Sequence, residues 1–187
     1  VHLEACAAKA TAEMDDRVTA YDIPSIVRDG LDFAKMLNRI NFEDAATANM
    51  LNESYRAVSD AAAARVPIML EPFISKWSDG KIKNDLSPEA VINSISIAQG
   101  LGNSSAYSWL KLPVVDRMDE VMAATSLPTL LLGGDPVEDQ DNIYESWDYA
   151  LALDGVRGLV VGRTLLYPQD GNVEAAIDTA VRLVHRS

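Results

Sequence analysis

The sequence has little of what metal centres, disulfide frameworks and membrane spans require. It contains one cysteine, Cys6, and two histidines, His2 and His185, which lie near the ends of the chain. A single cysteine cannot form an internal disulfide, which fits a reducing compartment, and none of these residues has a partner at ligand spacing. The apolar runs are far shorter than the roughly 18 residues that cross a bilayer. We therefore expect a cytoplasmic protein that uses no metal and no cofactor.

Basic residues are also scarce. The chain has 16 Lys and Arg against 28 Asp and Glu, which gives a formal net charge of -12 at pH 7. A surface of this sign repels nucleic acid and anionic membranes, so neither is an expected partner. The expected partner is a small molecule, and an anionic one would have to be held by a few local donors. The apolar faces of the predicted helices could pack within a barrel or against a second copy of the chain, so a homo-oligomer is a possible assembly.

What the sequence does contain is an alternation of apolar runs of strand length with longer amphipathic segments. With 187 residues, 48% of them hydrophobic, we expect a single domain over residues 1–187. The apolar runs occupy residues 33–40, 66–74, 107–115, 128–134 and 156–166. The amphipathic segments occupy residues 45–65, 88–101, 116–125, 143–153 and 173–185. Parallel strands need long crossovers, so this order predicts an α/β fold with a parallel sheet.

The first 32 residues fit the alternation less well. Residues 4–14 are helical by propensity, and residues 17–31 predict a short strand followed by a short helix that ends at Gly30. Five strands are therefore well supported and a sixth is weak. A closed (β/α)8 barrel usually needs about 250 residues. The chain is then either an open doubly wound sheet or a TIM-type barrel truncated in its first strands.

Three successive strands each place a charged residue inside an apolar run. These residues are Lys35, Glu71 and Lys111, and the chain has only six lysines in all. Alternate side chains of a barrel strand point inward, so Lys111 shares the inward face with Trp109. An ammonium group buried alone is costly, and a lysine so placed loses its proton or finds a carboxylate. A Lys-Glu-Lys cluster offers both outcomes.

Two simpler interpretations of these residues stay open. A lone lysine in a strand is often a sheet-end residue whose head reaches water. Alternatively, Glu71 and a lysine form a buried salt bridge with no chemical role. The occurrence of Lys35, Glu71 and Lys111 in three successive runs is what favours catalysis.

The last two strands end in glycine turns. Gly133 and Gly134 follow one strand, and Gly162 and Arg163 follow the next. Glycines at the carboxyl edge of a sheet let backbone N–H groups approach a ligand, and in α/β barrels the loops after the last two strands commonly hold a phosphate. Arg163 would add a fixed cation. Ordinary strand-ending turns would look similar, because a glycine pair alone is a weak signal.

In this order, the lysine in FAKMLNRI, the glutamate in IMLEPFI, the lysine in SWLKLPVV and the GGDP and VVGR turns resemble one superfamily. It is that of the class I aldolases related to deoxyribose-phosphate, archaeal-type fructose-bisphosphate and tagatose-bisphosphate aldolase. Residues 15–185 look similar to an actinobacterial branch of it, whose members are described as eightfold βα-barrel proteins or aldolases and are linked with inositol catabolism.

The resemblance implies roles for the charged residues. The superfamily's imine-forming lysine on strand six corresponds to Lys111. Tagatose-bisphosphate aldolase is similar in carrying a lysine on strand four and a glutamate on strand five, which correspond to Lys35 and Glu71. Phe33 would then begin strand four, and only about 32 residues precede it. The family's first strand, which commonly supplies an acidic active-site residue, is not found, so we expect a truncated chain or a fragment.

The mechanism expected from these residues is that of an aldehyde-lyase acting on a phosphorylated sugar or sugar acid. Lys111 would form a Schiff base with the substrate carbonyl, and Glu71 would move protons with Lys35 orienting it. Only the neutral amine attacks a carbonyl, so apolar walls from Trp109 and the neighbourhood of Leu112, with the like charge of Lys35, would have to favour deprotonation. A non-catalytic sugar-phosphate-binding barrel and an isomerase that uses Glu71 as a base are the alternatives.

Overall fold

The protein folds around a parallel sheet, as the order of apolar runs predicts. The structure is a computed structural model that describes residues 14, 16–133 and 139–185. In the described residues the strands are β1 (Ala34–Ile40), β2 (Ile68–Ser78), β3 (Lys81–Asp85), β4 (Ser108–Leu112), β5 (Thr129–Leu132) and β6 (Val156–Val160). Five strands pair in parallel in the order β1-β2-β4-β5-β6, and β3 pairs antiparallel with β2. The α/β prediction is confirmed.

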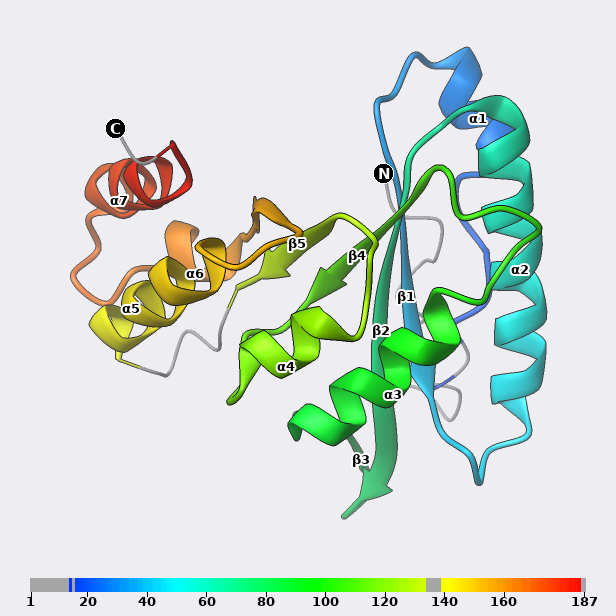
Figure 1. Cartoon of the computed structure of the whole chain (residues 1–187), viewed down its shortest axis with the longest axis horizontal. Helices are drawn as coiled ribbons and strands as arrows, with labels where there is room; N and C mark the ends of the chain where they lie inside the picture. Colours follow the sequence, from blue (N-terminus) through cyan, green and yellow to red (C-terminus); the bar gives the residue numbers. More distant parts are fainter. Residues whose placement is uncertain (1–13, 15, 134–138, 186–187) are drawn as a thin grey trace.

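Helices follow the strands and cover the sheet. Those in the described residues are α1 (Ile23–Arg28), α2 (Ala46–Ala64), α3 (Pro88–Ala98), α4 (Met118–Ala123), α5 (Gln140–Leu151), α6 (Arg163–Leu166) and α7 (Val173–His185). Figure 1 shows α2 alongside β1 and β2 at one end of the sheet, and α5, α6 and α7 grouped at the other end. Helix α3 begins as predicted, because the Ser87 side chain accepts a hydrogen bond from the N–H of Ala90 and Pro88 occupies the first turn.

The apolar core lies between the sheet and its helices. Its fully buried strand residues include Leu70, Leu110 and Leu112, which pack in one cluster with Val58 of α2 and Ile95 of α3. Burial of each such side chain stabilises the fold by roughly 1.5–3 kcal/mol. The strand residues that alternate with these leucines therefore face the other side of the sheet, where the charged residues lie.

The β2–β3 hairpin was not predicted. Strand β2 continues to Ser78, and two residues, Asp79 and Gly80, connect it to β3. Both have positive φ, 53° and 71°, as a two-residue type I′ turn requires. The Asp-Gly pair was the available signal, and the run of polar residues around it concealed the strand alternation.

Two other expectations need correction. The short strand expected near residue 18 is only an isolated bridge, although the helix after it, α1, is present and is followed by Gly30. The apolar run 156–166 is not one strand, because β6 ends at Val160 and the carbonyl of Gly162 accepts hydrogen bonds that begin α6. The helix expected over residues 4–14 falls almost wholly outside the described residues.

A search of the described residues for a membrane-spanning helix found none of sufficient length and apolar character.

Candidate active site

The three charged strand residues meet on the face of the sheet opposite the core. The Nζ atom of Lys35 lies 2.5 Å from Oε2 of Glu71, and the Nζ atom of Lys111 lies 2.9 Å from Oε1 of the same carboxylate. Their side chains are only 10%, 14% and 11% exposed, in the order Lys35, Lys111, Glu71. The interpretation of these lysines as sheet-end residues reaching water is therefore wrong. Both are held in one buried ionic cluster.

Strand register explains why they meet. Leu37 of β1 pairs with Glu71 of β2, so Lys35 stands two residues earlier on the same face of β1. Leu70 of β2 pairs with Leu110 of β4, which puts Lys111 directly beside Glu71. Because side chains alternate along each strand, all three point to one side. The parity argument made from the sequence is confirmed.

The apolar walls of the cluster differ in part from expectation. Trp109 lies on the same face as Lys111, and its ring packs edge-on against Phe33 with centroids 5.4 Å apart. Leu112, in contrast, is fully buried in the core beneath the helices. It lies on the opposite face of β4 because it is one residue from Lys111, so it forms no wall of the cluster.

Glu71 is held as a carboxylate by its two partners. Burial on its own would raise the pKa of Glu71, but the positive charges of Lys35 and Lys111 and the hydrogen bonds they donate lower it below its ordinary value. The carboxylate is therefore ionised at neutral pH. Among the described residues, the Glu71 carboxylate contacts both lysine amines, one on each oxygen.

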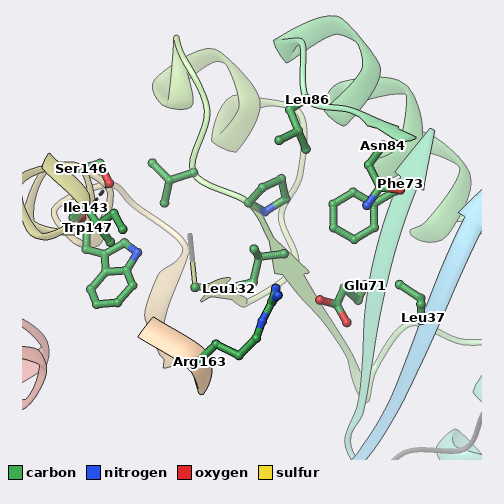
Figure 2. Close-up of a pocket in the computed structure, with 13 residues that line it drawn as sticks. Leu37, Glu71, Phe73, Asn84, Leu86, Leu132, Ile143, Ser146, Trp147 and Arg163 are labelled. Carbon is green, nitrogen blue, oxygen red and sulfur yellow. Dashed lines mark hydrogen bonds between the residues drawn. The ribbon is translucent and has the colours of Figure 1, made fainter. Parts of the chain in front are cut away.

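A cavity of about 550 Å³ opens above the cluster, and Glu71 forms part of its lining. Figure 2 shows its walls, which come from strands β1, β2, β3 and β5, the segments after β3, β4 and β5, and helices α5 and α6. The residues that line it are Leu37, Glu71, Phe73, Asn84, Leu86, Pro113, Val114, Leu132, Gly133, Ile143, Ser146, Trp147 and Arg163. A smaller cavity of about 150 Å³ shares Glu71, Gly133 and Arg163 with it and adds Lys111.

The two turns predicted to hold a phosphate lie side by side. A Cβ atom added to Gly133 would stand 3.2 Å from Oγ1 of Thr164 and 3.3 Å from Val161, so the absence of a side chain lets the two turns approach. A Cβ atom on Gly162 would meet nothing within 4 Å. Figure 2 shows the Arg163 side chain extending from α6 into the cavity, toward the side where Glu71 lies. Gly134, named with them from the sequence, lies outside the described residues.

A second buried ion pair was missed. Arg39, four residues beyond Lys35 on β1, donates from its Nε to both carboxylate oxygens of Asp16 at 3.0 and 3.1 Å, and its Nη2 also contacts that carboxylate. Its backbone N–H donates to the same group at 2.9 Å. Asp16 is 4% exposed. Asp16 was missed because the first 32 residues show no clear strand or helix pattern that would place it next to β1.

The sequence analysis also missed other residues that line the cavity. Asn84 lies on β3 of the unpredicted hairpin and Leu86 directly after it, and Ser146 and Trp147 lie on α5. No periodicity signals that helix residues will border a site built on strand ends. In the part of the chain that the structure describes, no group of three or more His, Cys, Asp or Glu side chains could hold a metal ion.

Comparison with solved structures supports the fold assignment. The structure of Cgl0159 from Corynebacterium glutamicum superposes with a TM-score of 0.92 and 60% identity, over 95% of this chain and 59% of that protein. The chain therefore spans less than two thirds of the length of this relative. An archaeal fructose 1,6-bisphosphate aldolase superposes with a TM-score of 0.73 and 18% identity, over 100% of this chain and 71% of that one. This match shows the fold, an α/β sheet of TIM-barrel type.

A structure of an archaeal fructose-1,6-bisphosphate aldolase with the catalytic lysine covalently bound to the carbinolamine intermediate of the substrate superposes with a TM-score of 0.75. It is 19% identical, and the match covers 99% of this chain and 70% of that one. A search of curated proteins found no match. The family model described as Cgl0159-like matches residues 5–181. Because this match covers nearly the whole sequence, the chain belongs to the Cgl0159-like family.

Proposed function

We propose that the chain carries the active site of a class I aldolase, which cleaves a phosphorylated sugar or sugar acid through a Schiff base on Lys111. The observation that carries the proposal is the buried cluster in which Glu71 contacts both lysine amines, at 2.5 and 2.9 Å, beneath a cavity of about 550 Å³. Two amines and one carboxylate at hydrogen-bond distance supply a nucleophile and a proton carrier in one place.

Cavity access distinguishes the two lysines. Lys111 lines the smaller cavity together with Arg163 and Gly133, whereas Lys35 lines neither of the two cavities at the cluster. A nucleophile must reach the substrate carbonyl, so Lys111 is the better candidate for the imine. Lys35 then serves as the buried cation that stays with Glu71 while Lys111 reacts.

The steps follow from these roles. Lys111 gives up a proton and its Nζ attacks the carbonyl carbon, forming a carbinolamine that loses water to give a protonated imine. The bond between the carbons α and β to the imine carbon then breaks as a base removes the proton of the β-hydroxyl. The electron pair of that bond passes to the imine, which becomes an enamine, and an aldehyde leaves. Protonation of the enamine and hydrolysis release the second product and restore Lys111.

Glu71 is the proposed proton carrier in these steps. It lies within hydrogen-bond distance of Lys111, so it is placed to accept the proton of the amine and to return it to the carbinolamine hydroxyl as water leaves. Lys35 would orient the carboxylate from its other oxygen. With Lys35 still present, transfer of a proton to Glu71 leaves one cation in the cluster.

The phosphate would lie between the turns that carry Gly133, Gly162 and Arg163, and Gly134, expected with them from the sequence, lies outside the described residues. The closeness of Gly133 to the turn at 161–164, and the entry of Arg163 into the cavity, support this placement. A phosphate fixed there would hold the substrate carbonyl against Lys111 rather than leave it to diffuse. The fold that the chain shares with archaeal fructose-1,6-bisphosphate aldolases is consistent with this chemistry. In one structure of such an aldolase, the catalytic lysine is covalently bound to the carbinolamine intermediate of the substrate.

Reductive trapping tests the proposal. The protein is incubated with deoxyribose 5-phosphate, fructose 1-phosphate or fructose 1,6-bisphosphate and sodium borohydride, and the modified peptide is located by mass spectrometry. We expect an adduct on Lys111 that disappears in Lys111→Met, together with all turnover. The matched variant Lys35→Met should still be trapped at Lys111.

Each other outcome has a defined meaning. An adduct on Lys35 in the Lys111→Met protein would reverse the roles of the two lysines. Exchange of substrate hydrogen for deuterium without any adduct would indicate an isomerase that uses Glu71 as its base. Binding without an adduct or exchange would indicate a sugar-phosphate-binding barrel that has no catalytic role.

A further inference from the structure

The β2–β3 hairpin forms a wall of the cavity away from the proposed phosphate site. Strand β2 carries Glu71, Phe73 and Ser75 on its inward face, and Ser75 pairs with Asn84 of β3. Ser75 lies four residues beyond Glu71, which is about 13 Å along a strand. In Figure 2, Leu86 and Asn84 lie on one side of the cavity and Arg163 on the other, with Glu71 and Leu132 between. A ligand anchored at Arg163 and bonded near Glu71 would extend toward this hairpin.

Asn84 presents a neutral donor on this wall. The buried hydroxyl of Ser75, which is 2% exposed, donates to Oδ1 of Asn84 at 2.8 Å. This bond fixes the amide, and no described residue accepts a hydrogen bond from its Nδ2. An amide nitrogen held in this way suits a hydroxyl or carbonyl oxygen of a ligand.

The rest of this wall is apolar. Leu86 is 51% exposed and lines the cavity together with the side chains of Phe73, Val114 and Trp147. Among the described residues that line this cavity, Arg163 is the one cation, and the remaining charged group is Glu71. A second phosphate at the hairpin end would lose hydration without meeting a positive charge, which is unfavourable.

The hairpin has cations, but they point the other way. Lys83 pairs with Lys76 across the hairpin, one residue from the Ser75–Asn84 pair. Because side chains alternate along a strand, both lysines lie on the face opposite Asn84. Lys81, two residues before Lys83, lies on that same face, so three of the six lysines of the chain stand on this hairpin without lining the cavity.

We propose that the β2–β3 hairpin selects the end of the substrate remote from the phosphate, and that Asn84 and Leu86 favour a sugar with one phosphate and an uncharged far end over a bisphosphate. This inference rests on the proposed function for the placement of the phosphate at Arg163. It goes further by naming the substrate class and the residues that discriminate.

Ligands without a carbonyl test this selection separately from the chemistry. A hexitol 1-phosphate and a hexitol 1,6-bisphosphate cannot form an imine, so their affinities, measured by titration calorimetry, do not depend on Lys111 acting as a nucleophile. We expect the monophosphate to bind about tenfold more tightly than the bisphosphate. Asn84→Leu should weaken the monophosphate about tenfold, because one hydrogen bond to the ligand is lost.

The decisive variant is Leu86→Lys, which places a cation on the wall. It should reverse the preference, raising the ratio of bisphosphate to monophosphate affinity at least about tenfold. The neutral variant Leu86→Gln should keep the wild-type preference, and Lys83→Gln, on the opposite face, should leave it unchanged.

Tighter binding of the bisphosphate by the wild-type protein would overturn the inference, as would binding of neither hexitol or an unchanged ratio in Leu86→Lys. These outcomes are independent of borohydride trapping. An adduct on Lys111 with no selection in the hexitol experiment would leave the aldolase proposal standing and remove only the role of the hairpin.

Discussion

Two buried carboxylates, Glu71 and Asp16, neutralise cations that stand on the same face of β1, and they do so differently. Glu71 is shared by two lysines from two strands, one on each oxygen. Asp16 is committed to one arginine, Arg39, through that residue's guanidinium and its backbone N–H. Among the described residues, the first carboxylate therefore contacts two side-chain cations from two strands, whereas the second contacts the side chain of one residue.

The difference separates a site suited to chemistry from a structural contact. An arginine keeps its proton under all ordinary conditions and matches a carboxylate through two N–H groups, so Asp16 and Arg39 form a fixed pair. A lysine can give up its proton and become a nucleophile. Because Lys35 also contacts Glu71, the buried carboxylate still has a positively charged partner when Lys111 moves away from it. Under the proposed function, the lysine cluster is therefore the one that reacts, and the arginine pair is structural.

The largest effect on stability should come from breaking the Asp16–Arg39 pair. In Arg39→Met, Asp16 stays buried with no cation, so the free energy of unfolding should fall by about 3–5 kcal/mol. Lys111→Met should cost much less, because Glu71 keeps Lys35. Urea unfolding of both variants, followed by circular dichroism, measures the difference.

The double variant Asp16→Asn, Arg39→Met is the control for this comparison. Removing both charges should recover part of the lost stability, since no uncompensated carboxylate remains. Arg39→Met and Lys111→Met could instead lower the free energy of unfolding equally. That result would show that sharing Glu71 between two lysines does not reduce the cost of losing one of them, and would contradict the distinction between the two clusters.

Much of the site could be predicted from the sequence because charge and strand periodicity point to the same residues. Lys35, Glu71 and Lys111 stand out against apolar neighbours, and the two-residue period of a strand fixes which side they face. Their meeting then requires only that the three strands be neighbours in register, which the parallel sheet provides. The glycines at positions 133 and 162 were found by a similar argument from strand ends.

The remaining parts depend on long-range packing that leaves no periodic mark. Asp16 meets Arg39 across 23 positions of sequence, in a segment without clear strand or helix pattern. Trp147 has the spacing of an ordinary buried helix residue, and only the packing of α5 brings it to the cavity. The hairpin did have a local signal in Asp79 and Gly80, but β3 is only five residues long and largely polar.

Arg163 sharpens the comparison as a cation that lines the cavity with no carboxylate partner among the described residues. Arg163→Ala should leave the free energy of unfolding nearly unchanged. It should raise KM for a phosphorylated substrate about ten- to hundredfold, because a charge-assisted hydrogen bond to phosphate is lost. The dephosphorylated analogue should show no such change, and Arg157→Ala, at the other end of the β6–α6 unit, is the matched control. Equal effects on both substrates would remove the phosphate site.

The smallest expected effect is a change in stability with pH. It distinguishes the contribution of the Glu71 charge from that of the side chain's size and packing. The pKa of Glu71 is lower in the folded protein than its ordinary value of 4.5, so its stabilising contribution is complete above that value and is lost as pH falls through the folded-state pKa. The stability difference between wild type and Glu71→Gln should therefore stay constant from about pH 8 to about pH 5 and shrink below that range. A difference that grew on acidification would mean that burial outweighs the two lysines, and that Glu71 enters the reaction cycle already protonated.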